Sequence, residues 1–362
     1  MEHCATPAGD ARRDALYRWS AAWATEQAGL RPAGELEVVS GDASFRRYFR
    51  LRHDRGSLIA VDAPPVKENS RPFVAIARVL HAHGVHVPEI LAADFDLGFM
   101  LLSDLGDTLL RPCLNETSVD ALYSQAMDEL RHLLSSPAPA DYALPPYDRA
   151  RLLTEMSLFP DWFIARYLGL TLSQEEADLV RTTCERIADD VLTQPTVFVH
   201  RDYHSRNLMV LPGNRLGVID FQDAVTGPIT YDLVSLLRDA YVEWPLARVT
   251  GWVEQFRQSL IAENLLPGAF DEAAFLCAFD WMGAQRHLKV VGIFARLSLR
   301  DGKHGYLDDI PLVFQYLLDE IRAYPELRAF RDWVARRVLP VYLEKRPDAA
   351  ARLARFLPDA GA

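Results

Sequence analysis

Two segments in the second half of the chain decide its fold: residues 197–210 read VFVHRDYHSRNLMV, and residues 217–223 read GVIDFQD. Each begins with a short apolar run that is typical of a buried strand and continues into charged residues. The first run leads into a loop at Asp202, and Asn207 follows five positions later, directly before a further apolar run. The second run ends at Asp220. A single Asp at a strand end often only caps a turn, so it is the ordered set that indicates function.

The order and spacing of these residues match the arrangement that enzymes use for phosphoryl transfer. In that arrangement a loop Asp takes the proton of the acceptor hydroxyl, while an Asn and a later Asp hold Mg²⁺ beside a nucleoside triphosphate. The ion prefers hard oxygen ligands, which carboxylate and amide groups supply. We therefore predict that Asp202 is the catalytic base, that Asn207 and Asp220 bind Mg²⁺, and that a nucleoside triphosphate is the phosphoryl donor.

The histidines of the chain do not indicate a zinc site. His200 and His204 are four residues apart, but no Glu follows His200 and the surrounding pattern is a strand and a turn rather than a helix. The group of His81, His83 and His86 lies at the end of an expected helix and is interpreted as a solvated helix terminus.

Hydrophobic patterning divides the chain into a strand-rich front part and a longer, mainly helical part. In the front part we expect helices at residues 12–28 and 73–83, and strands at residues 36–39, 45–51, 58–61 and 99–102. Behind it, helical patterning from residue 120 onward is interrupted by a Pro-rich surface loop at 137–146 and by strands at 196–199, 208–210 and 216–219. The sequence therefore predicts an α+β fold of two lobes with a ligand cleft between them, a small strand-rich N-lobe at residues 1–104 and a larger mainly helical C-lobe at residues 105–362.

Composition limits the classes of function. The 362 residues are 49% hydrophobic and 25% charged, which is typical of a globular protein rather than a disordered or fibrous one. With 39 basic and 50 acidic side chains the net charge is −11, which disfavours a broad surface for nucleic acid or anionic lipid. The four cysteines form no CxxC pair, and no apolar run is long enough for a membrane helix or a signal peptide. We expect a monomeric, cytoplasmic protein whose partners are small molecules.

Several blocks of the sequence resemble the aminoglycoside phosphotransferase (choline-kinase-like) family. Besides the two segments quoted above, these blocks are GDASFRRYFR at residues 41–50, DAPP at 62–65, GPITYDLV at 227–234 and QRHLKVVGIFARL at 285–297. The first and last of them are most similar to the bacterial anomeric N-acetylmuramate/N-acetylglucosamine kinases of cell-wall recycling. The resemblance covers most of the chain.

The resemblance implies a protein-kinase-like bilobal fold and an enzyme of peptidoglycan recycling that uses ATP and Mg²⁺ to phosphorylate the anomeric hydroxyl of N-acetylmuramate, N-acetylglucosamine or both. It places the nucleotide against the turn of Gly41, Asp42, Ala43, Ser44 and Phe45 and against the segment around Leu102 and Asp104. The lactyl carboxylate of N-acetylmuramate requires a nearby cation. Candidates for that cation are Arg286, His287 and Lys289, with Arg206 as another, and sugar contacts are also expected at His204 and Asp223. The alternative for Arg286 and Lys289 is a solvated helix face. Asp232 is expected to cap the helix that it opens or to clamp the catalytic loop. The alternatives are a kinase of aminoglycosides, choline or homoserine-like substrates and an inactive binding module.

One departure from the kinase pattern concerns lysine. Protein kinases carry a lysine on the third strand that contacts the phosphates and pairs with a helical Glu, whereas residues 57–65 here read SLIAVDAPP. The chain has four lysines, and Lys67 is the only one before residue 105. Either Lys67, or one of Arg46 and Arg47 in the expected phosphate turn, must supply the missing charge. Neighbouring residues of a strand point to opposite faces, so only one of the two arginines can face the cleft.

Overall fold

A computed structural model describes residues 10–41, 45–266, 268 and 270–358 of the chain. These residues form two compact units. The first, which we call the sheet unit, contains the described residues of Met1–Pro112 together with Ser118–Leu144 and Asn207–Asp223. The second, the helical unit, contains Cys113–Thr117, Pro145–Arg206 and the described residues of Ala224–Ala362.

Strands and helices follow one another along the chain. The strands are β1 (Pro32–Gly41), β2 (Arg47–His53), β3 (Gly56–Asp62), β4 (Ile90–Asp94), β5 (Phe99–Ser103), β6 (Thr196–Val199), β7 (Leu208–Val210), β8 (Leu216–Val218) and β9 (Val225–Pro228). The α-helices are α1 (Ala11–Ala28), α2 (Arg71–Ala82), α3 (Leu110–Cys113), α4 (Val119–Leu134), α5 (Arg149–Met156), α6 (Gln174–Val191), α7 (Tyr231–Leu237), α8 (Leu246–Ala262), α9 (Glu272–Asp301), α10 (Ile310–Glu320), α11 (Arg328–Trp333), α12 (Leu339–Lys345) and α13 (Ala350–Leu353). A π-helical segment, η1 (Phe159–Leu168), lies between α5 and α6.

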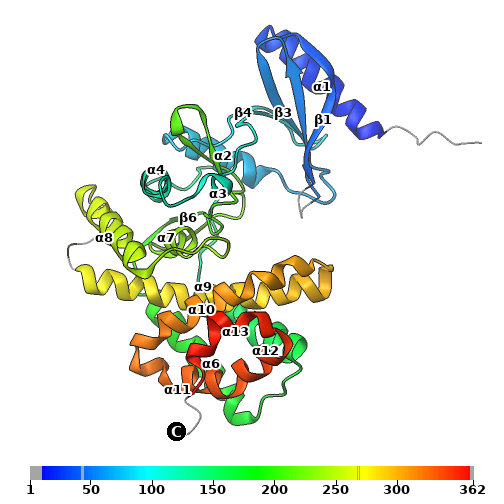
Figure 1. Ribbon diagram of the computed structural model, residues 1–362. Coiled ribbons are helices and arrows are strands. Elements are labelled where there is room, and N and C mark those ends of the chain that lie inside the picture. Colours follow the sequence, from blue (N-terminus) through cyan, green and yellow to red (C-terminus); the bar gives the residue numbers. More distant parts are fainter. Residues whose placement is uncertain (1–9, 42–44, 267, 269, 359–362) are drawn as a thin grey trace, which may run out of the picture. The chain divides into compact units, whose positions relative to one another are not determined.

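The sheet unit is built on five antiparallel strands in the order β1-β2-β3-β5-β4, with α1 lying along one face of the sheet (Figure 1). The packing of α1 follows from the two-residue period of a strand. Alternate apolar side chains, such as Phe49, Leu58 and Phe99, are buried in one cluster with Leu16 of α1. The side chains at the intervening positions of the same strands therefore point to the other face of the sheet.

The β7–β8 hairpin also belongs to the sheet unit. Two backbone hydrogen bonds of 2.7 Å attach it to the chain around the sheet, from the Val210 N–H to the carbonyl of Thr108 and from the Val218 N–H to the carbonyl of His86. Gly217 lies in β8 at a point of close approach, because a Cβ there would lie 2.8 Å from a methyl carbon of Leu105. The hairpin is thus fixed against the segment that follows β5.

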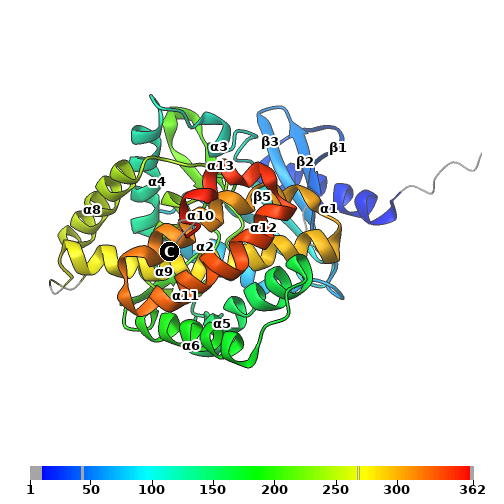
Figure 2. The same ribbon diagram turned by 60° about the horizontal axis from the view of Figure 1, so that its bottom comes forward.

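The helical unit is organised around α9, which runs through its middle (Figures 1 and 2). η1, α6, α7 and α10 all pack against this helix. Gly292 lets α9 approach the start of η1, since a Cβ at Gly292 would lie 2.3 Å from the backbone of Leu158. β6 and β9 form a short antiparallel ladder, and the loop after β6 contacts α9 through a hydrogen bond of 2.9 Å from Arg286 to the carbonyl of Arg201.

The predicted α+β organisation is confirmed, and most predicted elements lie within two residues of the observed ones. Two strands were not predicted. β4 contains alanines and an Asp, which have low strand propensity, and β9 contains the Gly227–Pro228 pair, so both depend on the partner strand beside them. The compact units also differ from a boundary at residue 104, because α4 packs on β8 and brings residues 118–144 and 207–223 into the sheet unit. No helix within the described residues has the length and apolarity that spanning a membrane requires.

Candidate active site

The loop after β6, which carries Asp202, is held by one buried carboxylate. Asp232, in the first turn of α7, accepts the backbone N–H of His200 at 2.6 Å and that of Arg201 at 2.9 Å. Arg201 has a left-handed backbone with φ of 80°, a conformation that costs a non-glycine residue about 1 kcal/mol or more. Of the two roles expected for Asp232, the structure shows the clamp, which compensates for this strain by satisfying both N–H groups.

Asp202 is partly buried within the helical unit, and its carboxylate stays ionised. Burial raises its pKa, but the positive charges of Lys289 and Arg286, with those of His204 and Arg201, outweigh this effect and lower the pKa to about 2. At neutral pH the side chain is therefore a charged hydrogen-bond acceptor. Such a group can orient a hydroxyl and receive its proton once the hydroxyl oxygen has begun to react.

A buried ionic cluster lies beside this loop. Glu155 of α5 accepts a hydrogen bond of 2.5 Å from Arg201 and lies 3.2 Å from the ammonium of Lys289. Lys289 also donates to the hydroxyl of Tyr231 at 3.0 Å, and the hydroxyl of Tyr147 donates to Glu155. Burial raises the pKa of Glu155, but the charges of Lys289 and Arg201 outweigh it, so the pKa is lowered and Glu155 is ionised. The cluster therefore contains two cations held around one carboxylate.

Three basic residues predicted to contact the sugar are largely buried. His287 is 1% exposed, and its ring pairs with Glu320 at 2.9 Å. Arg286 and Lys289 are each 6% exposed and donate to groups of the catalytic loop and the ionic cluster. The three sugar contacts stay predictions, and in the structure each of these side chains is already paired within the helical unit, as a buried charged or polar group requires.

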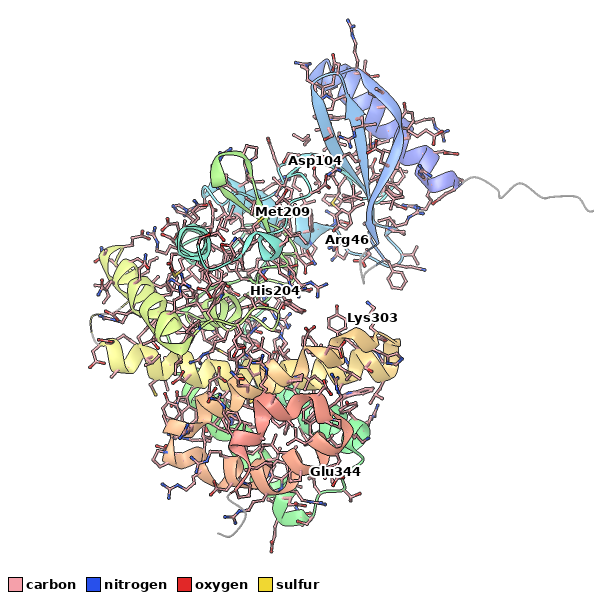
Figure 3. The ribbon with its side chains drawn as sticks, viewed as in Figure 1. Arg46, Asp104, His204, Met209, Lys303 and Glu344 are labelled. Carbon is pink, nitrogen blue, oxygen red and sulfur yellow. The ribbon has the colours of Figure 1, made fainter. Side chains whose placement is uncertain are left out.

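Arg206 differs from those three because its side chain is exposed. Its guanidinium lies 4.6 Å from the ring centre of Tyr241, and the ring of His204 (labelled in Figure 3) packs edge-on against the same tyrosine at 5.5 Å. Asp239 positions both sides of this stack, since it accepts the N–H of Ser205 at 3.0 Å and that of Tyr241 at 3.1 Å. Among the described residues no carboxylate forms an ion pair with Arg206. An exposed, oriented guanidinium can bind a carboxylate.

Asn207 and Asp220, which flank the β7–β8 hairpin in the sheet unit, lie side by side. The amide of Asn207 donates to the Asp220 carboxylate at 3.2 Å, and Gln222 donates to its other oxygen at 2.7 Å. No group of three or more His, Cys, Asp or Glu side chains suited to a metal occurs in the described part of the chain. One carboxylate and one amide provide only some of the oxygen ligands that a metal ion needs. This arrangement fits Mg²⁺, because this ion keeps waters and phosphate oxygens as its other ligands.

Asp104 directly follows β5, where adenine contacts are predicted (Figure 3). Its carboxylate accepts hydrogen bonds from Arg50 at 2.5 Å, from the Ser57 hydroxyl at 2.7 Å and from the Gly106 N–H at 2.8 Å. Although burial raises the pKa of Asp104, these bonds lower it overall. Leu102 is buried within β5. The Asp104 carboxylate thus fixes the conformation of the segment after β5 through these hydrogen bonds, rather than being directed at a ligand.

The remaining predicted ligand contacts have varied surroundings. Asp42, Ala43 and Ser44 lie outside the described residues, whereas Gly41 ends β1 and Phe45 is 58% exposed. Asp223, the last residue of the GVIDFQD segment, is exposed.

The three candidate cations for the phosphates have different partners. Arg47 forms an ion pair with Asp62, and Arg46 forms one with Glu68. Lys67 is exposed. The two arginines therefore differ in environment, although Arg46 directly precedes β2 and Arg47 begins it.

The family model of the phosphotransferase enzyme family (APH) matches residues 35–275, which is more than half of the chain and includes every residue of the loop and hairpin described above. This chain belongs to that phosphotransferase family. Curated relatives of the phosphotransferase agree with the assignment. A Pseudomonas putida protein is 46% identical over 307 residues, covering 85% of this chain and 89% of the relative, and a Pseudomonas aeruginosa protein is 46% identical over 308 residues, covering 85% and 90%. A Caulobacter vibrioides protein is 33% identical over 346 residues, covering 83% and 92%. All three are named N-acetylmuramate/N-acetylglucosamine kinase.

Solved structures show the same fold at low identity. An ADP-bound aminoglycoside phosphotransferase matches the chain with a TM-score of 0.54 at 15% identity, covering 84% of this chain and 98% of that one. The choline kinase LicA from Streptococcus pneumoniae matches with a TM-score of 0.52 at 12% identity, covering 84% and 99%. The phosphotransferase therefore has the protein-kinase-like fold that its sequence motifs predict.

Several residues of this phosphotransferase were missed by sequence reasoning, namely Tyr147, Glu155, Tyr231 and Asp239. The available signal was Arg201, since a cation placed directly after a buried strand needs a carboxylate partner. That partner, Glu155, is 46 positions away in sequence, so no local spacing identifies it.

Proposed function

We propose that this phosphotransferase transfers the γ-phosphoryl group of ATP to the anomeric hydroxyl of N-acetylmuramate and of N-acetylglucosamine. The observation that carries the proposal is the 46% identity, over 85% of the chain, to two curated kinases whose names contain both sugars. Two features support it. Asp202 of the helical unit is ionised, and in the sheet unit the oxygen-bearing side chains of Asn207 and Asp220 lie beside each other.

In this proposal Asp202 is the proton acceptor. A carboxylate with a pKa of about 2 is a weak base, so it receives the proton late, as the bond from the sugar oxygen to phosphorus forms. The anomeric hydroxyl is more acidic than an ordinary alcohol and needs only a weak base. Asn207 and Asp220 would hold Mg²⁺, which neutralises charge on the phosphates when it is bound. Lys289 and Arg286 keep Asp202 charged and therefore maintain it in its accepting form.

Recognition of the lactyl carboxylate is assigned to Arg206 within the same proposal. Of the four basic residues considered, three are buried and paired, whereas Arg206 is exposed and stacked on Tyr241. The stack holds the guanidinium in one orientation, which reduces the entropy lost when a carboxylate binds. N-acetylglucosamine lacks the lactyl group and would not use this contact.

Phosphorus NMR tests the reaction directly. The protein is mixed with Mg-ATP and, in separate samples, with N-acetylmuramate, N-acetylglucosamine, kanamycin or choline. We expect a sugar phosphate signal coupled to the anomeric proton with both amino sugars. The methyl glycoside of N-acetylglucosamine, in which the anomeric oxygen is blocked, is the matched control and should give no product. Turnover of kanamycin or choline without either sugar would contradict the proposed substrate, and a phosphorylated methyl glycoside would contradict the proposed hydroxyl.

A further inference from the structure

The phosphate chain of ATP needs a protein cation besides Mg²⁺, and β3 of this chain has no lysine to supply it. This question rests on the proposed use of a nucleoside triphosphate. The sequence leaves Lys67, Arg46 and Arg47 as candidates. Their surroundings in the sheet unit separate them.

Arg47 is already neutralised beside α1. It opens β2 directly opposite Asp62, the last residue of β3, and donates to the Asp62 carboxylate at 2.5 Å. A second ion pair joins Arg47 to Asp10, the residue that caps α1. Asp62 is fully buried and also accepts a hydrogen bond from Arg12 of α1. Arg47 therefore fastens α1 to the sheet, and its charge is matched by two carboxylates.

Arg46, the preceding residue, has entirely different neighbours. Its side chain is 6% exposed and pairs with Glu68 at 3.4 Å, and its guanidinium lies 5.3 Å from the ring centre of Phe73 on α2. Phe73 stacks on Phe221 with 4.9 Å between ring centres. Phe221 directly follows Asp220, the proposed magnesium ligand. A continuous line of contacts thus leads from Arg46 to the residue beside that ligand.

Glu68 holds the two residues before β2 through two contacts. Its carboxylate pairs with Arg46, and it also accepts the backbone N–H of Phe45 at 3.1 Å. Glu68 lies three positions before α2 begins at Arg71. It is only partly buried, so the pair contains one buried cation and one carboxylate that solvent can reach.

We propose that Arg46, positioned by Glu68, binds the ATP phosphates in place of the strand lysine. The arrangement suits arginine, because a planar guanidinium can stack on Phe73 with its face and still donate two parallel hydrogen bonds to phosphate oxygens with its edge. A lysine cannot do both. Lys67 is the competing candidate. It is exposed, and its ammonium lies 4.4 Å from the ring centre of the largely exposed Phe45.

Calorimetric binding of ATP and of adenosine separates a phosphate contact from a general loss of structure. In the Arg46→Met variant we expect ATP affinity to fall about 10- to 100-fold, the range for one charge-assisted interaction, and adenosine affinity to stay unchanged. Arg46→Lys should recover part of the lost ATP affinity, because lysine keeps the positive charge but cannot donate two parallel hydrogen bonds from a planar group. Glu68→Gln should weaken ATP binding less than Arg46→Met does. The matched control is Arg52→Met, which removes an exposed arginine of β2 that pairs with Glu37.

The outcomes are distinct. Unchanged ATP affinity in Arg46→Met, or an equal loss of ATP and adenosine binding, would overturn the assignment of Arg46. A large loss in Lys67→Met with none in Arg46→Met would overturn it in favour of Lys67. Wild-type protein that binds neither ATP nor ADP would instead show that the proposed phosphoryl donor is wrong.

Discussion

The ammonium group of Lys289 lies 3.2 Å from the carboxylate of Glu155, and the two residues are only 6% and 8% exposed. The pair joins α9 to α5 beside the loop that carries Asp202. Buried ion pairs contribute little net stability relative to apolar residues, yet removal of one partner leaves an uncompensated charge. The pair therefore matters less as a source of stability than as a fixed positive charge near the catalytic carboxylate.

Replacement of Lys289 tests this relationship. We expect Lys289→Met to lower the free energy of unfolding by about 3 kcal/mol, because Glu155 loses one of its two cations. Adding Glu155→Gln should restore part of that loss, with a coupling energy of about 1 kcal/mol or more. Urea unfolding of the four proteins measures both values. The exposed pair of Arg181 and Glu185 is the control and should couple by less than about 1 kcal/mol. Strictly additive effects of Lys289→Met and Glu155→Gln would show that the two charges do not interact.

Asp202→Asn should lower kcat about 1,000-fold, since an amide cannot accept the hydroxyl proton. Affinity for ATP should be retained, because the proposed nucleotide ligands lie elsewhere in the chain. Steady-state kinetics and calorimetry on the same preparation check the two statements. Turnover close to that of the wild type would remove Asp202 as the base.

Arg206→Met should raise KM for N-acetylmuramate about 10- to 100-fold, the loss expected for one charged hydrogen-bonding contact. Both kinetic constants for N-acetylglucosamine should stay unchanged, so the second sugar is an internal control in the same protein. Arg166, which is exposed and stacked on Trp162 at 3.9 Å, offers a matched control variant, Arg166→Met. An equal effect on both sugars would show that Arg206 supports the loop rather than the lactyl carboxylate.

The pKa of Asp202 predicts how its contribution to stability varies with pH. The folded pKa is about 2 against an ordinary value of 3.8, so the ionised form is favoured by folding. This contribution is present in full above the ordinary pKa and is lost as pH falls toward 2. The difference in unfolding free energy between wild type and Asp202→Asn should therefore be constant from about pH 7 to 5 and decrease below about pH 4. Urea titrations at these pH values measure it. A decrease already between pH 7 and 5 would mean that burial outweighs the neighbouring cations.

The element pattern could be predicted because it depends on local sequence, and the same local spacing is the basis on which the catalytic positions are proposed. β6 coincides with its predicted range. Asp202, Asn207 and Asp220 each lie at or near a strand end, as the sequence predicts. The surroundings of α9 could not be predicted in the same way. Arg286 and Lys289 have the composition of a solvated helix face, and only the packing of α5, α7 and η1 around α9 shows that they are buried.

The sequence by itself determined the chemistry, since residue type and short-range order specify which groups can accept a proton or bind Mg²⁺. Tertiary structure decided which side chains surround each of the cations. Arg46 and Arg47 are neighbours with identical side chains, and their surroundings differ because Arg46 contacts Glu68 and Phe73 whereas Arg47 contacts Asp62. The scarcity of lysine is visible in the sequence. Our proposal for the phosphate contact depends on surroundings that only folding creates, because Arg47 pairs with the fully buried Asp62 whereas Arg46 lies beside Phe73 and the partly buried Glu68.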